Sequence, residues 1–129
     1  MRVIWLSEKD MDKKQEDDLK TTLKKDDLHI IRIVATIPYS GDGAMFILNG
    51  VIDHYLVDRY ERINGVLAGI FPAHAAAAIA RELVQPAVYH SVQYPMKLEN
   101  GETYMQHSHW EYLNPLRERI YNARPNTAP

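Results

Sequence analysis

The chain has 129 residues, enough for one domain with a hydrophobic core but too short for two. Its formal net charge of -2 argues against a protein that binds duplex DNA, because such proteins carry a basic excess. It contains no cysteine, which excludes disulfides and thiolate metal sites and fits a cytoplasmic protein. No apolar stretch is long enough to cross a bilayer, and the amino terminus lacks the pattern of a signal peptide. We therefore expect a single cytoplasmic domain without a membrane contact.

Strand and helix patterns alternate along most of the chain. Apolar and β-branched runs predict strands over residues 2–7, 29–37, 65–71 and 87–94. Between them, helices are predicted from a cap at Ser7 or Asp10 to about residue 25, over 44–60, and over 73–83. This alternation is typical of a parallel sheet with helices on both faces. We predict a small Rossmann-like α/β domain.

The last third of the chain predicts an antiparallel β-hairpin at one edge of the sheet. Asn100-Gly101 favours a two-residue type I′ turn, which would place Glu99 opposite Glu102. A helical segment then leads out of the domain, which we place at residues 1–122. Residues 123–129 are expected to form a disordered tail.

The second hairpin strand carries two histidines in an H-x-H pattern. Simple alternation along a strand would put His107 and His109 on one face. The spacing shows no third ligand, so we expect no metal site. The pair is assigned either to a polar hairpin face or to a contact with a partner subunit.

Three successive strand ends carry residues that suit a ligand. Ligands of open parallel sheets bind beyond the carboxyl ends of the strands. Ser7 and Lys9 follow the first strand, and Pro72 and His74 follow the third, at the start of an alanine-rich helix. The loop after the second strand contributes Tyr39, Ser40, Gly41 and Gly43. We expect all of these to meet at one edge of the sheet, where free helix N–H groups attract anions.

Each of these features also has a purely structural interpretation. Ser7 suits a helix cap, and the glycine-containing loop suits an ordinary turn. Pro72 suits the first position of a helix, and alanines on a packed face let a helix approach closely. His74 can face solvent or bond to a neighbouring loop. The sequence leaves these alternatives open.

Three stretches together resemble a known family. The opening VIWLSEKDMDKKQEDDL, the central GVLAGIFPAHAAAAIAREL and the closing PMKLENGETYMQHSHWEYL resemble small CRISPR-associated proteins with a Rossmann-like (CARF-like) fold. The similarity is to those of ring nuclease type from type III CRISPR systems.

The resemblance implies a homodimer that binds cyclic oligoadenylate, with cyclic tetra-adenylate as the expected ring, and cleaves it to shut off antiviral signalling. In this family, a ribose 2′-hydroxyl attacks the adjacent phosphate and leaves a 2′,3′-cyclic phosphate, without metal or cofactor. Ser7 and His74 would be the catalytic residues, with Ser7 lining the phosphates and His74 acting as general acid or base. The other candidates, Lys9 and the Tyr39–Gly43 and Pro72 segments, would surround the ring. The alternative is a non-enzymatic nucleotide-sensing or protein-interaction module that dimerises through its hairpin.

Overall fold

A five-stranded sheet in the order β2-β1-β3-β4-β5 organises the chain. The structure is a computed structural model that describes residues 1–118. The strands are β1 (Arg2–Leu6), β2 (His29–Ile33), β3 (Val66–Gly69), β4 (Ala87–Lys97) and β5 (Thr103–Tyr112). β1 to β4 run parallel, and β5 lies antiparallel to β4 at the edge. This confirms the predicted Rossmann-like α/β fold, while the predicted domain end at 122 and the tail at 123–129 lie outside the described residues.

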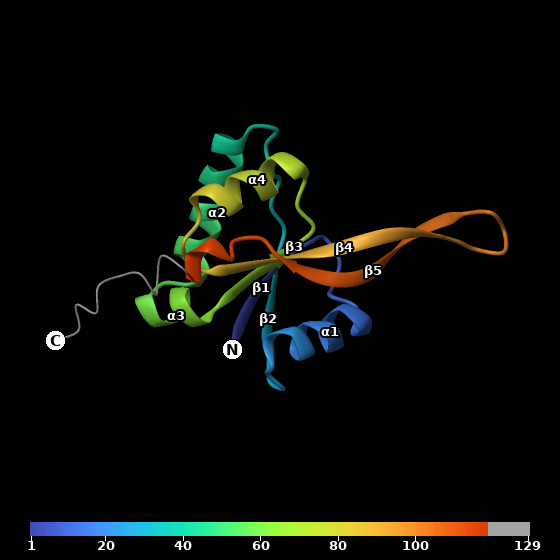
Figure 1. Cartoon of the computed structure of the whole chain (residues 1–129), viewed down its shortest axis with the longest axis horizontal. Helices are drawn as coiled ribbons and strands as arrows, with labels where there is room; N and C mark the ends of the chain where they lie inside the picture. The colour runs from blue at the N-terminus through green and yellow to red at the C-terminus, as the bar shows by residue number, and fades with distance from the viewer. Residues whose placement is uncertain (119–129) are drawn as a thin grey trace.

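Helices cover both faces of the sheet (Figure 1). α1 (Lys13–Leu23) lies on one face, and α2 (Gly41–Tyr55) and α4 (Ala73–Glu82) pack on the other. The short α3 (Arg59–Asn64) lies near the amino ends of the strands. Within residues 1–118, none of these helices has both the length and the apolar character needed to cross a membrane.

Alternate side chains of the sheet build a separate core on each face. On the α1 face, Trp5 and Trp110 meet edge to face with ring centroids 6.0 Å apart, and Leu19 of α1 belongs to the same cluster. Ile4 and Leu67 point to the other face, into the core formed with α2 and α4. All four residues of β3 are buried, which explains why its sequence is an unbroken apolar run.

Two helices begin at residues other than the predicted ones. α1 starts after Asp12, whose Oδ1 accepts from the Gln15 N–H (2.7 Å) while Gln15 Oε1 accepts from the Asp12 N–H (2.9 Å). This capping box means that the predicted caps, Ser7 and Asp10, are wrong. The helix predicted over 44–60 begins earlier and is divided into α2 and α3, because Asp58 caps a new helix.

α4 begins at Ala73 as predicted, and two of its alanines are buried against α2. A Cβ added to Gly41 at the start of α2 would lie 3.5 Å from the Cβ of Ala78. Ala75 is also fully buried. The small side chains therefore let the two helices approach closely, whereas outward-facing alanines such as Ala77 contribute helix propensity alone.

β4 and β5 continue beyond the rest of the sheet as a two-stranded arm, residues 93–106 (Figure 1). At its tip, the Gly101 N–H donates to the Leu98 carbonyl (3.0 Å), and the Leu98 N–H donates to the Glu102 carbonyl (2.7 Å). Gly101 has φ +85°, in the left-handed region. This is a three-residue loop, so the predicted type I′ turn is wrong and Glu102 lies opposite Leu98 instead of Glu99.

A β-bulge in β5 changes which side chains share a face. Neighbouring residues of β4 pair with His109 and with His107, so Ser108 is the extra residue. His107 and Trp110 consequently lie on the same buried face, with ring centroids 5.0 Å apart, while His109 is exposed. The predicted common face of His107 and His109 is wrong, because the bulge inserts one residue into the alternation.

Candidate functional site

A cavity opens at the carboxyl edge of the sheet, where the strand order changes direction. β1 and β3 are neighbours there, and the chain leaves them for opposite sides of the sheet. Ligands of open α/β sheets bind at such switch points. The cavity has a volume of about 560 Å³, and its lining includes Ser7, Lys9, Asp10, Asp12, Ile70, Gln93 and Tyr104. We call it the switch-point cavity.

The loop after β1 is held rigidly against the core. Ser7 Oγ accepts from the Lys9 N–H (3.1 Å), and the Lys9 carbonyl accepts from Trp5 Nε1 (2.7 Å). The Ser7 N–H donates to the Ile33 carbonyl of β2 (3.1 Å). Because Trp5 is itself buried in the α1-side core, these bonds fix the backbone from which Lys9 projects.

The charges around this loop leave one cation unpaired. Asp10 pairs with Arg32 (3.1 Å), and Asp12 is committed to capping α1. No carboxylate within residues 1–118 lies at ion-pair distance from the Lys9 ammonium group. The cavity is therefore lined by the Lys9 ammonium group and by two carboxylates, Asp10 and Asp12, that already have partners.

The opposite wall of the cavity comes from the arm and from Ile70, and it is largely apolar. Tyr104 and Met105 of β5 and Ile70 after β3 all line the cavity and are each at least 43% exposed. Gln93 of β4 adds an amide, which both donates and accepts hydrogen bonds. A flat apolar group with a polar edge and an attached anion fits this combination.

His74 lies outside the switch-point cavity. Its Nε2 is 2.5 Å from the Pro38 carbonyl oxygen, and its ring lies 6.3 Å from the ring of Tyr39. Tyr39 is 97% exposed. The imidazole therefore fastens the segment before α2 to the start of α4.

The remaining predicted site residues support the same α2–α4 junction. Ser40 caps α2, accepting from the Gly43 N–H at 3.0 Å. A Cβ on Gly43 would lie 2.9 Å from Pro38, so glycine is required for this close approach. Pro72 is the N-cap residue of α4. The candidates thus form two groups: Ser7 and Lys9 at the cavity, and Tyr39, Ser40, Gly41, Gly43, Pro72 and His74 at the α2–α4 side.

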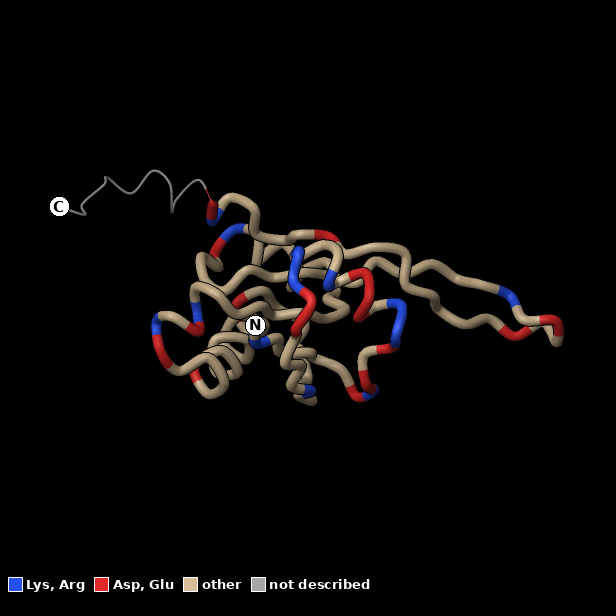
Figure 2. Tube along the Cα trace, turned by 90° about the horizontal axis from the view of Figure 1, so that it is seen from below, with Lys and Arg blue, Asp and Glu red and all other residues tan. Residues whose placement is uncertain are grey.

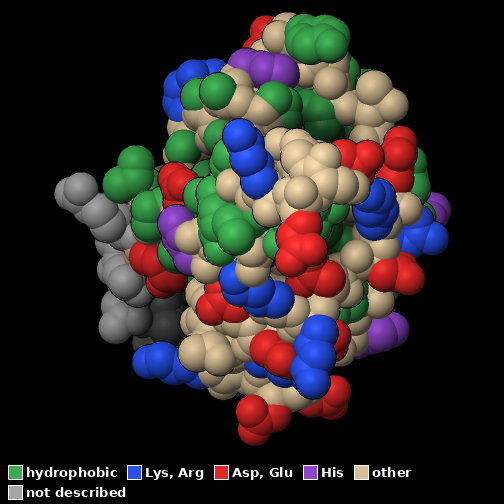
Figure 3. Space-filling view, turned by 90° about the vertical axis from the view of Figure 1, so that its right-hand side faces the viewer, with side chains coloured by type: hydrophobic (Ala, Val, Ile, Leu, Met, Phe, Trp, Pro, Cys, Tyr) green, Lys and Arg blue, Asp and Glu red, His purple; other side chains and the backbone are tan. Residues whose placement is uncertain are grey.

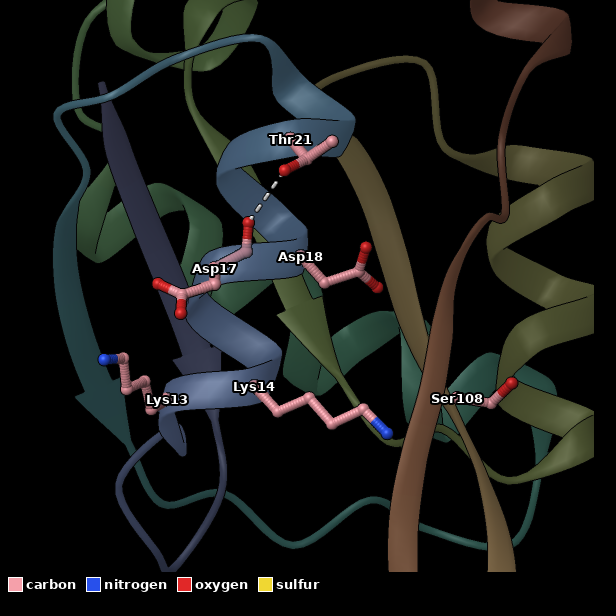
Figure 4. A pocket seen from close by; sticks show the side chains of 6 residues that line it. All are labelled: Lys13, Lys14, Asp17, Asp18, Thr21 and Ser108. Carbon is pink, nitrogen blue, oxygen red and sulfur yellow. Dashed lines mark hydrogen bonds between the residues drawn. The ribbon is translucent and has the colours of Figure 1, made fainter.

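A buried polar chain links α1 to the base of the arm, and sequence reasoning did not find it. Asp18 Oδ2 lies 2.8 Å from His107 Nε2, and His107 Nδ1 lies 2.6 Å from Ser91 Oγ. Gln15 Nε2 donates to the same Ser91 oxygen at 3.3 Å. Figure 4 shows Asp18 pointing from α1 toward the β4–β5 pair. Because Ser91 is fully buried, this chain holds elements together and offers no accessible nucleophile.

His90 was also missed, since it lies within the predicted fourth strand. Its Nδ1 accepts from the Phe71 N–H at 3.0 Å, next to the end of β3. Burial lowers the pKa of His90, an effect that Glu111 partly opposes and His109 adds to. A neutral ring with its hydrogen on Nε2 satisfies this bond.

No group of three or more metal-ligating side chains within residues 1–118 is placed to hold a metal ion. No protein-family model, curated protein or solved structure matches this chain.

Proposed function

We propose that this chain binds a nucleotide in the switch-point cavity. The observation that carries the proposal is that the loop after β1 and Ile70 after β3 line one cavity at the strand-order reversal. Its volume of about 560 Å³ falls within the range of small-molecule sites. Cyclic oligoadenylate is the proposed ligand class, since the family resemblance implies it, with type III CRISPR signalling as its setting.

The lining residues suit the parts of a nucleotide. The Lys9 ammonium group would contact a phosphate, and the rigid Trp5–Lys9 loop reduces the entropy lost on binding. A base would lie against Ile70 and Tyr104, and the Gln93 amide would bond to its polar edge.

We propose binding without cleavage. Attack by a ribose 2′-hydroxyl requires one group to take up its proton and another to protonate the leaving 5′-oxygen. His74, which the resemblance implies for this step, has its Nε2 against Pro38 and does not line the cavity. A nucleotide sensor therefore fits better than a ring nuclease, and the homodimer implied by the resemblance is part of the same proposal.

Calorimetric titration with cyclic tetra-adenylate and cyclic hexa-adenylate tests the proposal. We expect at least one ring to bind, and Lys9→Ala to weaken binding by about tenfold or more, because a charge-assisted bond to phosphate is lost. Lys20→Ala is the matched control, since Lys20 lies on α1 outside the cavity. Gln93→Ala should also weaken binding, whereas Gln106→Ala on the neighbouring strand should not.

Failure of both rings to bind would refute this ligand class. Binding that neither Lys9→Ala nor Gln93→Ala weakens would refute the site. The same samples, incubated in EDTA and resolved by chromatography, also test the absence of cleavage. Linear products ending in a 2′,3′-cyclic phosphate would replace the sensor with a ring nuclease.

A further inference from the structure

No strand within residues 1–118 pairs with the outer edge of β5. β5 is the last strand of the sheet, and hydrogen bonds alternate along an antiparallel pair, so every second residue directs its backbone groups away from its neighbour. The Leu98 N–H donates to the Glu102 carbonyl, so Glu102 directs its backbone groups toward β4 and the next residue, Thr103, directs them away. Thr103, Met105 and His107 therefore direct their N–H and C=O groups to the free edge.

The two edges of the arm differ in how they are protected. On the outer edge of β4, the same alternation turns Pro95 and Lys97 outward. Proline has no N–H, and an edge lysine disfavours strand pairing. Residues 103–108 of β5 contain neither a proline nor a charged side chain. The β5 edge alone therefore remains open to a further strand.

Both ends of the arm carry charges of both signs: Lys97, Glu99 and Glu102 at the tip, and Lys13, Lys14, Asp17 and Asp18 around the hollow at the base. Glu99 and Glu102 lie at its tip, while residues 93–96 and 103–106 carry no charge (Figure 2). At its base, Lys14 points from α1 toward β5 (Figure 4), with its Nζ 5.9 Å from the ring centre of Tyr94. Lys14 lies in the first turn of α1, where the helix dipole disfavours a cation. A further carboxylate would pair with Lys14 in a hollow that Asp17 and Asp18 also line, where Asp18 is already paired with His107.

Exposed apolar side chains lie between the two charged ends. Met96, Leu98, Tyr104 and Met105 are all partly exposed along the arm. Figure 3, viewed from the side toward which the arm points, shows acidic, basic and hydrophobic side chains close together on this face. An isolated two-stranded ribbon is marginally stable in water, so a partner along the arm would stabilise it.

We propose that β5 pairs with β5 of a second copy of this chain, antiparallel, across a two-fold axis at Met105. In this register, Met105 faces Met105 of the partner subunit, and Thr103 faces His107 of the partner subunit. All the outward-facing backbone groups of the stretch are then paired with each other. Glu102 then lies opposite Ser108 of the partner subunit. Within each subunit, Ser108 and Lys14 line the same surface hollow.

The contact between Glu102 at the tip of one arm and Lys14 at the base of the other favours a second copy over an unrelated peptide. A peptide from another protein would pair with the edge but would not place a carboxylate beside Lys14. A two-fold axis brings both tips to both bases at once. The inference rests on the homodimer of the proposed function, for which it names the interface, and does not depend on the ligand.

Sedimentation of the full chain tests the pairing, and we expect a dimer. Met105→Pro removes an N–H that faces the free edge and removes no bond to β4, so it should give a monomer. Met105→Ala keeps this N–H and should remain dimeric. Circular dichroism of both variants shows whether the arm and the domain remain folded.

A charge exchange tests the register without altering the backbone. Glu102→Lys and Lys14→Glu should each weaken dimerisation by about tenfold or more, since two attractive contacts become repulsive. An equimolar mixture of the two variants should form a heterodimer, because both tip-to-base contacts are attractive again. Lys25→Glu is the matched control, since Lys25 lies beyond the carboxyl end of α1 and outside the hollow that Lys14 lines.

Circular dichroism of the Lys14→Glu variant shows whether it is folded, because a carboxylate in the first turn of α1 favours the helix while Asp17 and Asp18 oppose it. A parent chain that stays monomeric would overturn the proposal and leave the edge to a strand from another protein. A dimer that Met105→Pro leaves intact would place the interface elsewhere. A mixture of the charge variants that stays monomeric would overturn the register.

Discussion

Removal of the Ser91 hydroxyl should destabilise the protein far more than the size of the group suggests. Ser91 Oγ is fully buried, accepts from Gln15 Nε2 (3.3 Å) and lies 2.6 Å from His107 Nδ1. Ser91→Ala leaves both nitrogens buried without this partner, at about 1–3 kcal/mol for each group. Because the bond from Gln15 is long, we expect the free energy of unfolding to fall by about 2–4 kcal/mol. This corresponds to roughly 10 °C in melting temperature.

Urea denaturation followed by circular dichroism measures this loss. Ser108→Ala is the matched control, because the Ser108 hydroxyl bonds to His109 Nδ1 at an exposed position. It should change the free energy of unfolding by less than about 0.5 kcal/mol. Adding His107→Phe to Ser91→Ala removes both partners of the short contact between these side chains. The free energy of unfolding of the double variant should therefore fall by less than the sum of the decreases in the two single variants. Equal stability of the two alanine variants would refute the reasoning.

Three further predictions concern other parts of the molecule. Asn114 is buried and bonds to three backbone groups at the amino end of β4, so Asn114→Ala should lower the free energy of unfolding by about 3–5 kcal/mol in urea denaturation. Burial lowers the pKa of His90 below its ordinary 6.5, so the unfolded chain binds this proton more readily than the folded one. Its contribution to stability is therefore fully present above pH 6.5 and is lost as the pH falls toward the lowered value. The variant His90→Gln keeps an acceptor for the Phe71 N–H. In urea denaturation, its free energy of unfolding should fall less steeply between about pH 7 and pH 5 than that of the parent chain. Gly101→Ala should cost about 1 kcal/mol in thermal denaturation, because φ +85° is strained for alanine although the site has open space.

The fold was predictable because it depends on patterns that are local in the sequence. Residues 65–71 form an unbroken apolar run, which is typical of a central parallel strand, and β3 lies within that run. The strand that follows Asn100-Gly101 returns antiparallel, as the glycine indicates. The size of the turn was not predictable, because a glycine in the left-handed region serves both a two-residue and a three-residue loop.

Which site residues lie together depends on the face of the sheet over which each connection passes, and no single segment of the sequence indicates that face. Each connection between parallel strands passes over one face of the sheet. α1 passes over one face, and α2 and α4 pass over the other. Ser7 and Lys9 therefore turn away with α1, while His74 and the loop before α2 lie with the opposite layer. Position along the carboxyl edge was predictable, but the choice of face was not.

The buried polar chain was hidden for a related reason. Its members come from α1, β4 and β5, and Asp18 and His107 are 89 residues apart. The bulge at Ser108 turns His107 inward, and alternation within the strand gives no sign of it. The one local sign of the buried polar chain is Gln15, a polar residue in the helix cap that also lies on the apolar face of the helix.

Gln15 also connects the stability of the arm to the switch-point cavity. It lines the cavity, and its amide donates to Ser91 at the base of the arm. The arm in turn supplies the apolar wall of the cavity. A change at Ser91 should therefore weaken ligand binding as well as stability, whereas Asn114→Ala acts at the opposite end of β4 and should alter stability alone. Comparison of these two variants at a temperature where both are folded separates the role of the arm in the site from its role in the fold.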